Sequence, residues 1–575
     1  MKMAVGLCAG LLVVGAMAGT APATGETWRV AEWAFEASRD YGSGGGDDVK
    51  LDVAFTEQAT GRTLVRPGFW DGDRTFRVRF APPAAGEWSW RTSCVDDAAL
   101  AGRTGTFAAV PYDGPLELYR RGFVTVRPGA KHFTYADGTP FFYLGDTHWG
   151  LYTEELDEAG PHAGDVKTDS HLGYLVRRRV EQGFTVLQSE PIGARFDVRD
   201  GHVDAADIPG FRDADRYYRL IADAGLVHAN AEFFFASQMN AALATNAVAL
   251  ARLSRYWAAR FGAYPVMWTL AQEIDNSFYH ERGDQRVYSC TNNPWVKVAE
   301  CLHACDAYGH PLSGHQENTW HTTVTGAGTS APTRDGNGRS VFADAAVAKR
   351  TGHSWWAVQW SPPLKGNAQA DIAKDYWNDC RPAVNYEGRY CCLWTKDFGA
   401  RAQGWISLLS GMCGYGYGAI DIWLYKSTHD TKKDSHDGVD KITVADKLLP
   451  WSKAVEFESA RQAGYMRRFF ERIAWWRLKP DFTDGVRFRP DAGALYTCAA
   501  DGDRLAVVYF HGASTATGVV RGLKAEGAYV FDWFNPRTGH TASSVSVRAD
   551  ASGELRLPAK PDEKDWVVLV DRCQN

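Results

Sequence analysis

The stretch VMWTLAQEIDNSFYH, residues 266–280, begins as an apolar run and then turns polar at Gln272, Glu273 and Asp275. Its apolar part, up to about Leu270, has the length and composition of a buried strand. A buried strand gains nothing from carboxylates at its end unless that end opens on a site. In α/β barrels the C-terminal ends of the strands carry the functional residues, so the stretch predicts a strand that ends at an active site.

Seven further apolar runs accompany this one, and segments with the periodicity of amphipathic helices separate most of them. The eight predicted strands lie within residues 140–146, 184–190, 226–235, 265–273, 311–317, 356–360, 381–387 and 413–423. The predicted helices lie within residues 170–183, 211–225, 245–262, 294–309, 369–380 and 398–411. Eight strands that alternate with helices are typical of a (β/α)8 TIM barrel, so we predict an α/β catalytic barrel over residues 116–480.

Runs that alternate with period two flank this region on both sides. GEWSWRTSC at residues 86–94 is one of several such runs before the barrel, and they predict an N-terminal β-sandwich over residues 24–115. LAVVYFHG at residues 505–512 is one of several after it, and they predict a C-terminal β-sandwich over residues 481–575.

The first 23 residues combine Lys2, an apolar core and small residues at the end, which is the pattern of a secretory signal peptide. We therefore predict a secreted or periplasmic protein without a membrane anchor. Ten of the eleven cysteines remain after cleavage, an even number that suits disulfide bonds in an oxidising compartment, although the spacing leaves their connectivity open. The candidate bridges join Cys498 to Cys573, Cys391 or Cys392 to Cys380 or Cys413, and Cys290 to Cys301 or Cys305.

The net charge and the tryptophan content indicate which kind of molecule the protein binds. A formal net charge of -6 gives no attraction to nucleic acid or to an anionic membrane. The chain contains 22 Trp, and exposed indole faces are the usual platforms on which sugar rings stack. The alternative is that these rings fill the cores of the sandwiches. The expected substrate is a carbohydrate.

Polar or aromatic residues end every predicted strand. They are Asp146, His148, Glu190, Glu232, Gln272, Glu273, His315, Glu317, Trp360, Glu387, Asp421 and Trp423. Glu273 and Glu387 end the fourth and seventh strands, on opposite sides of one barrel mouth, where their side chains can converge. Glycoside hydrolysis with retention needs two carboxyl groups about 5–5.5 Å apart. We predict that Glu273 is the general acid/base and that Glu387 is the nucleophile, kept ionised by a neighbour such as Tyr386 or Arg389. The alternative is that either glutamate is a loop residue or a salt-bridge partner.

Three stretches then show a resemblance to a known family. FFYLGDTHWGLYTEE (141–155), YLVRRRVEQGFTVLQSE (174–190) and GYGYGAIDIW (414–423) are similar to segments of apiosidase-like glycoside hydrolases. The resemblance implies a retaining TIM-barrel enzyme with an N-terminal β-sandwich and a C-terminal β-sandwich of a collagen-binding-like type. It also implies that Asp146, His148 and Trp149 line the pocket for the terminal sugar.

The end of the fourth strand departs from the family pattern. The family leads us to expect an aspartate in a Gly-Gly-Asp-like sequence, whereas this chain has Ala271-Gln272-Glu273. That sequence resembles the Asn-Glu pair of the wider retaining barrel clan, in which the residue before the acid/base binds the sugar 2-hydroxyl. The likeness implies that role for Gln272, and a stacking role for Trp423.

The predicted function is that of a secreted retaining glycoside hydrolase acting on a polysaccharide or its side chains, with a pentofuranoside as the substrate class that the family favours. The alternatives are a carbohydrate-binding or adhesion protein on an inactive barrel, and a transglycosylase with the same site. No cofactor is expected. Cys301, His303 and Cys305 share a predicted helix, but an exported protein more often oxidises such thiols, so we predict no metal.

Overall fold

The structure is a computed structural model, and the residues that it describes are 22–153, 170–191, 193–230, 239–271, 274, 293–317, 340–362, 364, 371–391, 395, 397–419, 422, 451–483 and 487–573. Several predictions fall outside these residues: the signal peptide up to residue 21, Glu232, Gln272, Glu273, Asp421, Trp423, Cys290 and Cys392. In the described part of the chain, every helix is too short or too polar to span a membrane.

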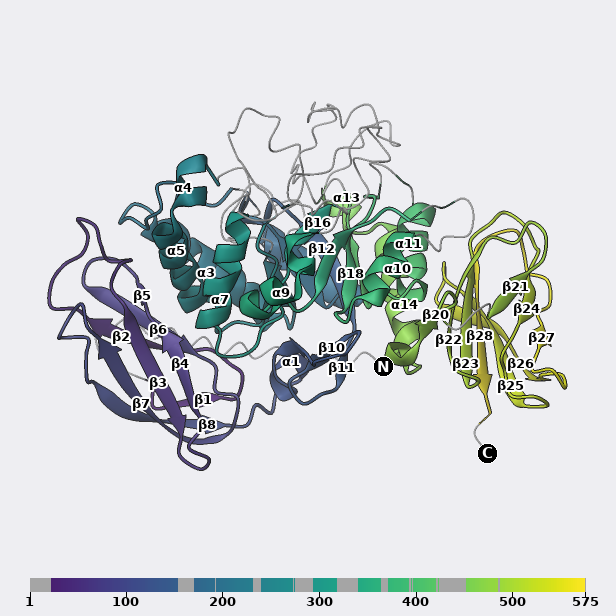
Figure 1. Ribbon diagram of the computed structural model, residues 1–575, viewed down its shortest axis with the longest axis horizontal. Coiled ribbons are helices and arrows are strands. Elements are labelled where there is room, and N and C mark those ends of the chain that lie inside the picture. The colour runs from purple at the N-terminus through teal and green to yellow at the C-terminus, as the bar shows by residue number, and fades with distance from the viewer. Residues whose placement is uncertain are drawn as a thin grey trace, which may run out of the picture.

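One sheet of eight parallel strands occupies the centre of the molecule (Figure 1). Its strands are β12 (Tyr143–His148), β13 (Val186–Ser189), β14 (Val227–Asn230), β15 (Val266–Trp268), β16 (His315–Glu317), β17 (Trp356–Gln359), β18 (Ala383–Glu387) and β19 (Gly414–Tyr417). Their order in the sheet is β15-β14-β13-β12-β19-β18-β17-β16, so the first and last strands along the chain are neighbours. Each of the eight predicted apolar runs therefore contributes one strand.

Hydrogen bonds also connect the two ends of this strand order. The Trp268 N–H, at the end of β15, donates to the Pro311 carbonyl at 2.8 Å, and the Ser313 N–H donates to the Trp268 carbonyl at 2.8 Å. Trp268 and Leu312 form a parallel bridge. The segment that leads into β16 thus pairs with β15.

Helices connect the strands, and the amphipathic segments seen in the sequence form most of them. They are α2 (His171–Gln182), α3 (Ile208–Asp223), α5 (Ala247–Phe261), α7 (Pro294–Cys305), α10 (Asp371–Asn378) and α11 (Asp397–Leu409). The caps follow the local sequence: the Ser170 hydroxyl accepts from the Gly173 N–H at 3.0 Å, and Gly183 ends α2 with φ +97°. The structure also contains two helices that the sequence did not predict, α9 (Ala345–Thr351) and α14 (Glu458–Glu471).

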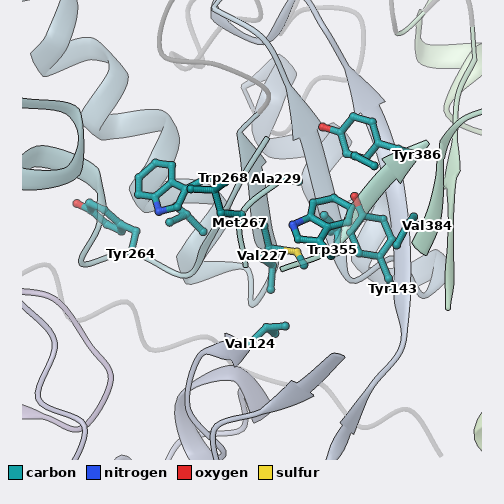
Figure 2. Packing of buried hydrophobic residues seen from close by; sticks show 14 of the residues in the cluster. Val124, Tyr143, Val227, Ala229, Tyr264, Met267, Trp268, Trp355, Val384 and Tyr386 are labelled. Carbon is teal, nitrogen blue, oxygen red and sulfur yellow. The ribbon is translucent and has the colours of Figure 1, made fainter. Parts of the chain in front are cut away.

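Buried rings fill the inside of the central sheet (Figure 2). The ring centroids of Tyr143 and Trp355 lie 6.0 Å apart, and those of Trp355 and Tyr386 also lie 6.0 Å apart. Phe133, from a small sheet below the strand starts, packs on Trp355 at 5.5 Å. That sheet contains β9 (Val124–Val126), β10 (Phe133–Tyr135) and β11 (Pro140–Phe141).

Two sheets precede the central one (purple in Figure 1), and all their strand pairs are antiparallel except the parallel pair of β1 and β8. One contains β1 (Thr24–Glu26), β8 (Thr104–Val110), β7 (Gly86–Cys94), β3 (Leu51–Glu57) and β4 (Thr63–Pro67). The other contains β2 (Ala31–Glu36), β6 (Thr75–Phe80) and β5 (Phe69–Trp70). They pack on each other through aromatic rings, such as Phe55 on Phe80 with centroids 4.1 Å apart.

A buried ion-pair network joins the N-terminal sheets to α3 and α5. Asp215 of α3 accepts from Arg79 Nη1 at 2.6 Å and from Arg260 Nη2 at 2.7 Å. Arg260 Nη2 also donates to Asp71 at 3.0 Å. Burial alone would raise the pKa of Asp215, but Arg260 and Arg79 lower it to about 2. Two arginines and two aspartates thus hold the junction.

Two further sheets follow α14 (yellow in Figure 1). The larger contains β20 (Lys479–Pro480), β22 (Tyr496–Asp501), β23 (Leu505–Phe510), β28 (Trp566–Arg572), β25 (Ala528–Asn535) and β26 (His540–Arg548). The smaller contains β21 (Phe488–Pro490), β24 (Gly518–Val520) and β27 (Leu555–Arg556). Arg401 of α11 anchors them through Asp565, with Nε and Nη2 each 2.8 Å from a carboxylate oxygen.

The predicted bridge between Cys498 and Cys573 is wrong, because neither cysteine forms a disulfide bond. Cys498 on β22 is level with Val508 on β23, which is level with Val568 on β28. Two strand spacings, about 10 Å, therefore separate Cys498 from β28. A disulfide needs Cα atoms less than about 7 Å apart.

Bridges from Cys391 to Cys380 or Cys413 are also absent from the described residues. Cys391 bridges Ala419, beyond the C-terminal end of β19, whereas Cys413 precedes the first residue of that strand. The four residues of β19 span about 13 Å. The two cysteines therefore lie at opposite ends of the central sheet.

Candidate active site

The parallel strands bring their C-terminal ends to one end of the central sheet, and the described candidate residues at these ends are buried. They are Asp146, His148, Trp149, Glu190, His315, Trp360, Tyr386 and Glu387. Gln272, Glu273, Asp421 and Trp423 lie outside the described residues, so the separation of Glu273 from Glu387 stays a prediction.

An irregularity in β18 shapes the site. The pairing with β17 shifts register, so that Val358 is level with Asn385 but Gln359 is level with Glu387. Tyr386 is thus an extra residue, a β-bulge. Without the bulge, Tyr386 and Glu387 would point to opposite faces of the sheet.

With the bulge, both side chains reach His315 on β16. The Tyr386 ring centroid lies 4.9 Å from that of His315, and Glu387 Oε2 lies 3.4 Å from His315 Nε2. Asn385, one residue earlier, points the other way, since its Nδ2 donates to Ser407 of α11 at 2.9 Å. The bulge therefore turns the carboxylate into the site.

A phenol contacts the same carboxylate. The Tyr390 hydroxyl donates a short hydrogen bond to Glu387 Oε1, and the Tyr390 oxygen accepts from Trp149 Nε1 at 2.7 Å. Burial, and after it the charge of Glu387, holds the pKa of Tyr390 well above its usual value. Tyr390 therefore keeps its proton at neutral pH and serves as a donor.

Two histidines of the central sheet, His315 and His228, are neutral. Burial lowers the pKa of His315 to about 3, so this ring adds no positive charge beside Glu387. Burial and the nearby His148 lower the pKa of His228 to about 3 as well. His228 Nε2 lies 2.6 Å from the Ser189 hydroxyl, and its ring centroid lies 4.4 Å from that of Tyr218, so this ring lies between the sheet and α3.

Asp146, two residues before the end of β12, belongs to a buried charge cluster. Its Oδ2 lies 2.7 Å from His148 Nε2 and 2.7 Å from Arg179 Nε. Burial alone would raise the pKa of Asp146, but Arg179 and His148 lower it. Arg179 also donates to the Val455 carbonyl at 2.9 Å, which fixes the guanidinium. Asp146 is therefore an ionised carboxylate that orients His148.

Three further candidate site residues lie near Glu387. Trp149 is 1% exposed and its ring centroid lies 5.8 Å from that of Tyr386. The Trp360 N–H donates to the Glu387 carbonyl at 3.0 Å. Glu190, 1% exposed, is near enough for its charge to raise the pKa of Tyr390.

The backbone after β15 makes a tight turn. Leu270 has φ +52°, and the Ala271 N–H donates to the Thr269 carbonyl at 2.6 Å, which closes a γ-turn. The Ile274 N–H then donates to the His315 carbonyl at 3.0 Å. A left-handed conformation in a non-glycine residue is strained, and such strain concentrates at functional sites.

The sequence did not point to three residues around this site, Arg179, Tyr390 and Gln403. Arg179 and Gln403 are each 1% exposed, and a polar residue on the inward face of a helix is a usable signal. Tyr390 follows Glu387 by three residues outside any strand, and no periodicity marks it.

One group of potential metal ligands lies elsewhere among the described residues: Asp47, Asp48 and His202. Arg252 already lies 3.2 Å from Asp47 and 2.6 Å from Asp48. Its Nη2 also donates to His202 Nε2 at 3.0 Å. The Arg252 guanidinium supplies the positive charge that a cation would bring. Asp47, Asp48 and His202 therefore serve to join the loop between β2 and β3 to α5.

Comparisons with known proteins agree on the kind of fold. Residues 127–477 match the family model described as "Apiosidase-like, catalytic domain", and residues 24–95 match a domain of unknown function, DUF5060. No curated protein matches the chain.

Several solved structures are similar. A candidate glycoside hydrolase from Bacteroides vulgatus has 17% identity and a TM-score of 0.63, with 96% of this chain and 100% of that chain covered. A family 5 glycoside hydrolase from the same species has 13% identity and a TM-score of 0.53, with coverages of 79% and 93%. A further structure titled a glycoside hydrolase has 14% identity and a TM-score of 0.52, with coverages of 78% and 97%.

Proposed function

The chain belongs to the apiosidase-like family, whose catalytic-domain model it matches over residues 127–477, and we propose that it cleaves a glycosidic bond with retention of the anomeric configuration. The single observation that carries this proposal is the placement of Glu387. It is 3% exposed at the C-terminal end of a parallel strand, and it accepts a hydrogen bond from Tyr390. Hydrogen bonds to the charged form keep a carboxylate ionised, as a nucleophile requires.

In the proposed first step, a Glu387 oxygen attacks the anomeric carbon while the bond to the leaving oxygen breaks. Glu273 gives its proton to that oxygen, and a glycosyl ester of Glu387 forms. In the second step Glu273 takes a proton from water, and the water oxygen displaces Glu387 from the anomeric carbon. No cofactor takes part in either step.

The architecture behind this mechanism is a closed (β/α)8 barrel within residues 116–480. The bonds of Trp268 with Pro311 and Ser313, which join β15 to the segment before β16, support closure. Closure puts the ends of β15 and β18 on one mouth, as the pair of glutamates requires. One β-sandwich domain precedes the barrel, at residues 24–115, and another follows it, at residues 481–575. A signal peptide before the first sandwich directs the protein to the periplasm or the medium.

The substrate is a carbohydrate, and the family favours a pentofuranosyl unit on a polysaccharide. We assign Gln272 to the sugar 2-hydroxyl, Trp423 to stacking, and Asp421 to the pocket wall. We also assign Asp146, His148 and Glu190 to that wall.

The test uses 4-nitrophenyl glycosides of pentofuranosyl and hexopyranosyl sugars. Glu387→Ala should lower turnover at least about a thousandfold, because the covalent step is lost. Glu181→Ala, which removes a carboxylate that is 49% exposed on α2, is the matched control. Full activity of Glu387→Ala would exclude the mechanism, and binding of sugars without any turnover by the unaltered protein would favour a carbohydrate-binding role instead.

A further inference from the structure

The four residues Glu387-Gly388-Arg389-Tyr390 form a turn that returns the Tyr390 hydroxyl to the Glu387 carboxylate. We infer that Tyr390 is a positioning residue that fixes the orientation and the ionised state of Glu387, and that Trp149 acts on Glu387 through Tyr390. The inference rests on the proposed function, since it gives Glu387 the role of nucleophile.

The direction of the hydrogen bonds supports this order. An indole N–H can only donate, so the 2.7 Å contact from Trp149 Nε1 uses a lone pair of the Tyr390 oxygen. The Tyr390 proton then points to Glu387 Oε1. Trp149 therefore sets the rotation of the phenol O–H, and the phenol holds one oxygen of the carboxylate.

Gln403 of α11 holds the middle of the turn. Its Oε1 accepts from the Arg389 N–H at 2.7 Å, and its Nε2 donates to the Arg389 carbonyl at 3.0 Å. A Cβ on Gly388 would lie 2.8 Å from Gln403 Oε1, so a larger residue there would push the amide away. Gln403 thus holds the Arg389 backbone at both its N–H and its carbonyl.

The end of β19 holds the Tyr390 ring. A Cβ on Gly418 would lie 2.1 Å from Tyr390 Cδ1, so the ring lies directly on the glycine. The Cys391 N–H donates to the Gly418 carbonyl at 2.9 Å, which fixes the backbone beside the ring. Groups held from several sides need no reorganisation during a reaction, which is how positioned donors contribute to catalysis.

Tyr390→Phe removes the donor and keeps the ring. We expect kcat on a 4-nitrophenyl glycoside to fall about tenfold to a hundredfold, with KM changed less than about threefold, because a bond to a charged group is lost. A hydrogen bond to the ionised form lowers a carboxyl pKa, so its loss raises the pKa of Glu387. The acidic limb of kcat/KM should therefore move upward by about one pH unit.

The order of action is tested by a double variant. Trp149→Phe should lower kcat less than Tyr390→Phe does. The variant with both changes should be no slower than Tyr390→Phe alone, within about twofold, because the hydrogen bond from Trp149 reaches the carboxylate through the Tyr390 oxygen. Losses that multiply would overturn the order of action.

Tyr415→Phe is the matched control. The Tyr415 hydroxyl is buried and donates to the Ala400 carbonyl of α11 at 2.9 Å, away from Glu387. It should keep the kcat and the pH limb of the unaltered protein, and the same limb shift in this control would overturn the role of Tyr390.

Glu387→Ala distinguishes a failure of the positioning role of Tyr390 from a failure of the proposed nucleophile. An inactive Glu387→Ala beside a fully active Tyr390→Phe overturns only the positioning role. An active Glu387→Ala overturns the proposed nucleophile, and with it the reason for a positioning residue.

Discussion

Asp215 lies at the centre of the ion-pair network between the N-terminal sheets and helices α3 and α5. Arg260 is fully buried, Arg79 is 3% exposed, and both side chains donate to the Asp215 carboxylate. Asp215→Asn keeps the shape of the side chain and removes its charge. Asp71 and Glu32 then remain as the carboxylates that contact the two arginines.

The expected loss can be worked from the ionisation of Asp215. Its pKa falls from an ordinary 3.8 to about 2 on folding, and at about 1.4 kcal/mol for each pH unit this corresponds to about 2–3 kcal/mol. Asp215→Asn also leaves two buried arginine charges with fewer carboxylates, and removal of one partner of a buried pair typically costs about 3–5 kcal/mol. Because the folded pKa is the lower one, this contribution is present above pH 4 and is lost as the pH falls toward 2.

Urea unfolding followed by tryptophan fluorescence measures the effect at pH 7 and again near pH 3. The difference between the unaltered protein and Asp215→Asn should be about 3–5 kcal/mol at pH 7 and smaller at the lower pH. Asp213→Asn is the matched control on the same helix. Its side chain is 31% exposed and lies 3.3 Å from Arg195, so the loss should stay below about 1 kcal/mol. Equal losses for the two variants, or a difference that does not depend on pH, would refute the reasoning.

Three further predictions concern other sites. Gly388→Ala should lower kcat about tenfold with little change in the unfolding midpoint, since its Cβ would displace Gln403; steady-state kinetics beside thermal denaturation would show it, and unchanged kcat would contradict it. Arg401→Met should lower the free energy of unfolding by about 3–5 kcal/mol, because Asp565 would stay buried without its bidentate partner; a thermal midpoint equal to that of the unaltered protein would speak against this. His315→Asn should leave the pH limbs of kcat/KM between pH 5 and 8 in place, because burial lowers the pKa of His315 to about 3; a limb near pH 6 that disappears in the variant would show that the ring titrates there.

The strands of the central sheet were predictable because each is a local pattern. An apolar run that ends in a polar residue, such as the one that ends at Glu387, needs no knowledge of the rest of the fold. The helices followed for the same reason, and their glycine ends, such as Gly183, were readable as well. Helix α14 was missed although its residues are amphipathic, because it follows a long polar segment that obscured the alternation.

The contacts of Glu387 were not predictable in the same way. Tyr390 reaches the carboxylate only because Gln403, on a helix that begins ten residues after β18 ends, holds the turn between them. The bulge at Tyr386 depends on the pairing of β17 with β18, which no single strand encodes. The cysteine pairings failed for a related reason, since Cys498 and Cys573 are distant across a sheet whose strand order the sequence does not state.

The bulge in β18 also has a consequence for how this protein can change. Before the bulge, side chains alternate between the inside of the sheet and α11, so a substitution there changes the packing of the core. At the bulge this alternation is interrupted, so two consecutive residues, Tyr386 and Glu387, both face inward. Loss of Tyr386 together with the bulge would therefore remove one ring and keep the carboxylate in the site, whereas regular pairing of the same five residues would turn Glu387 toward α11.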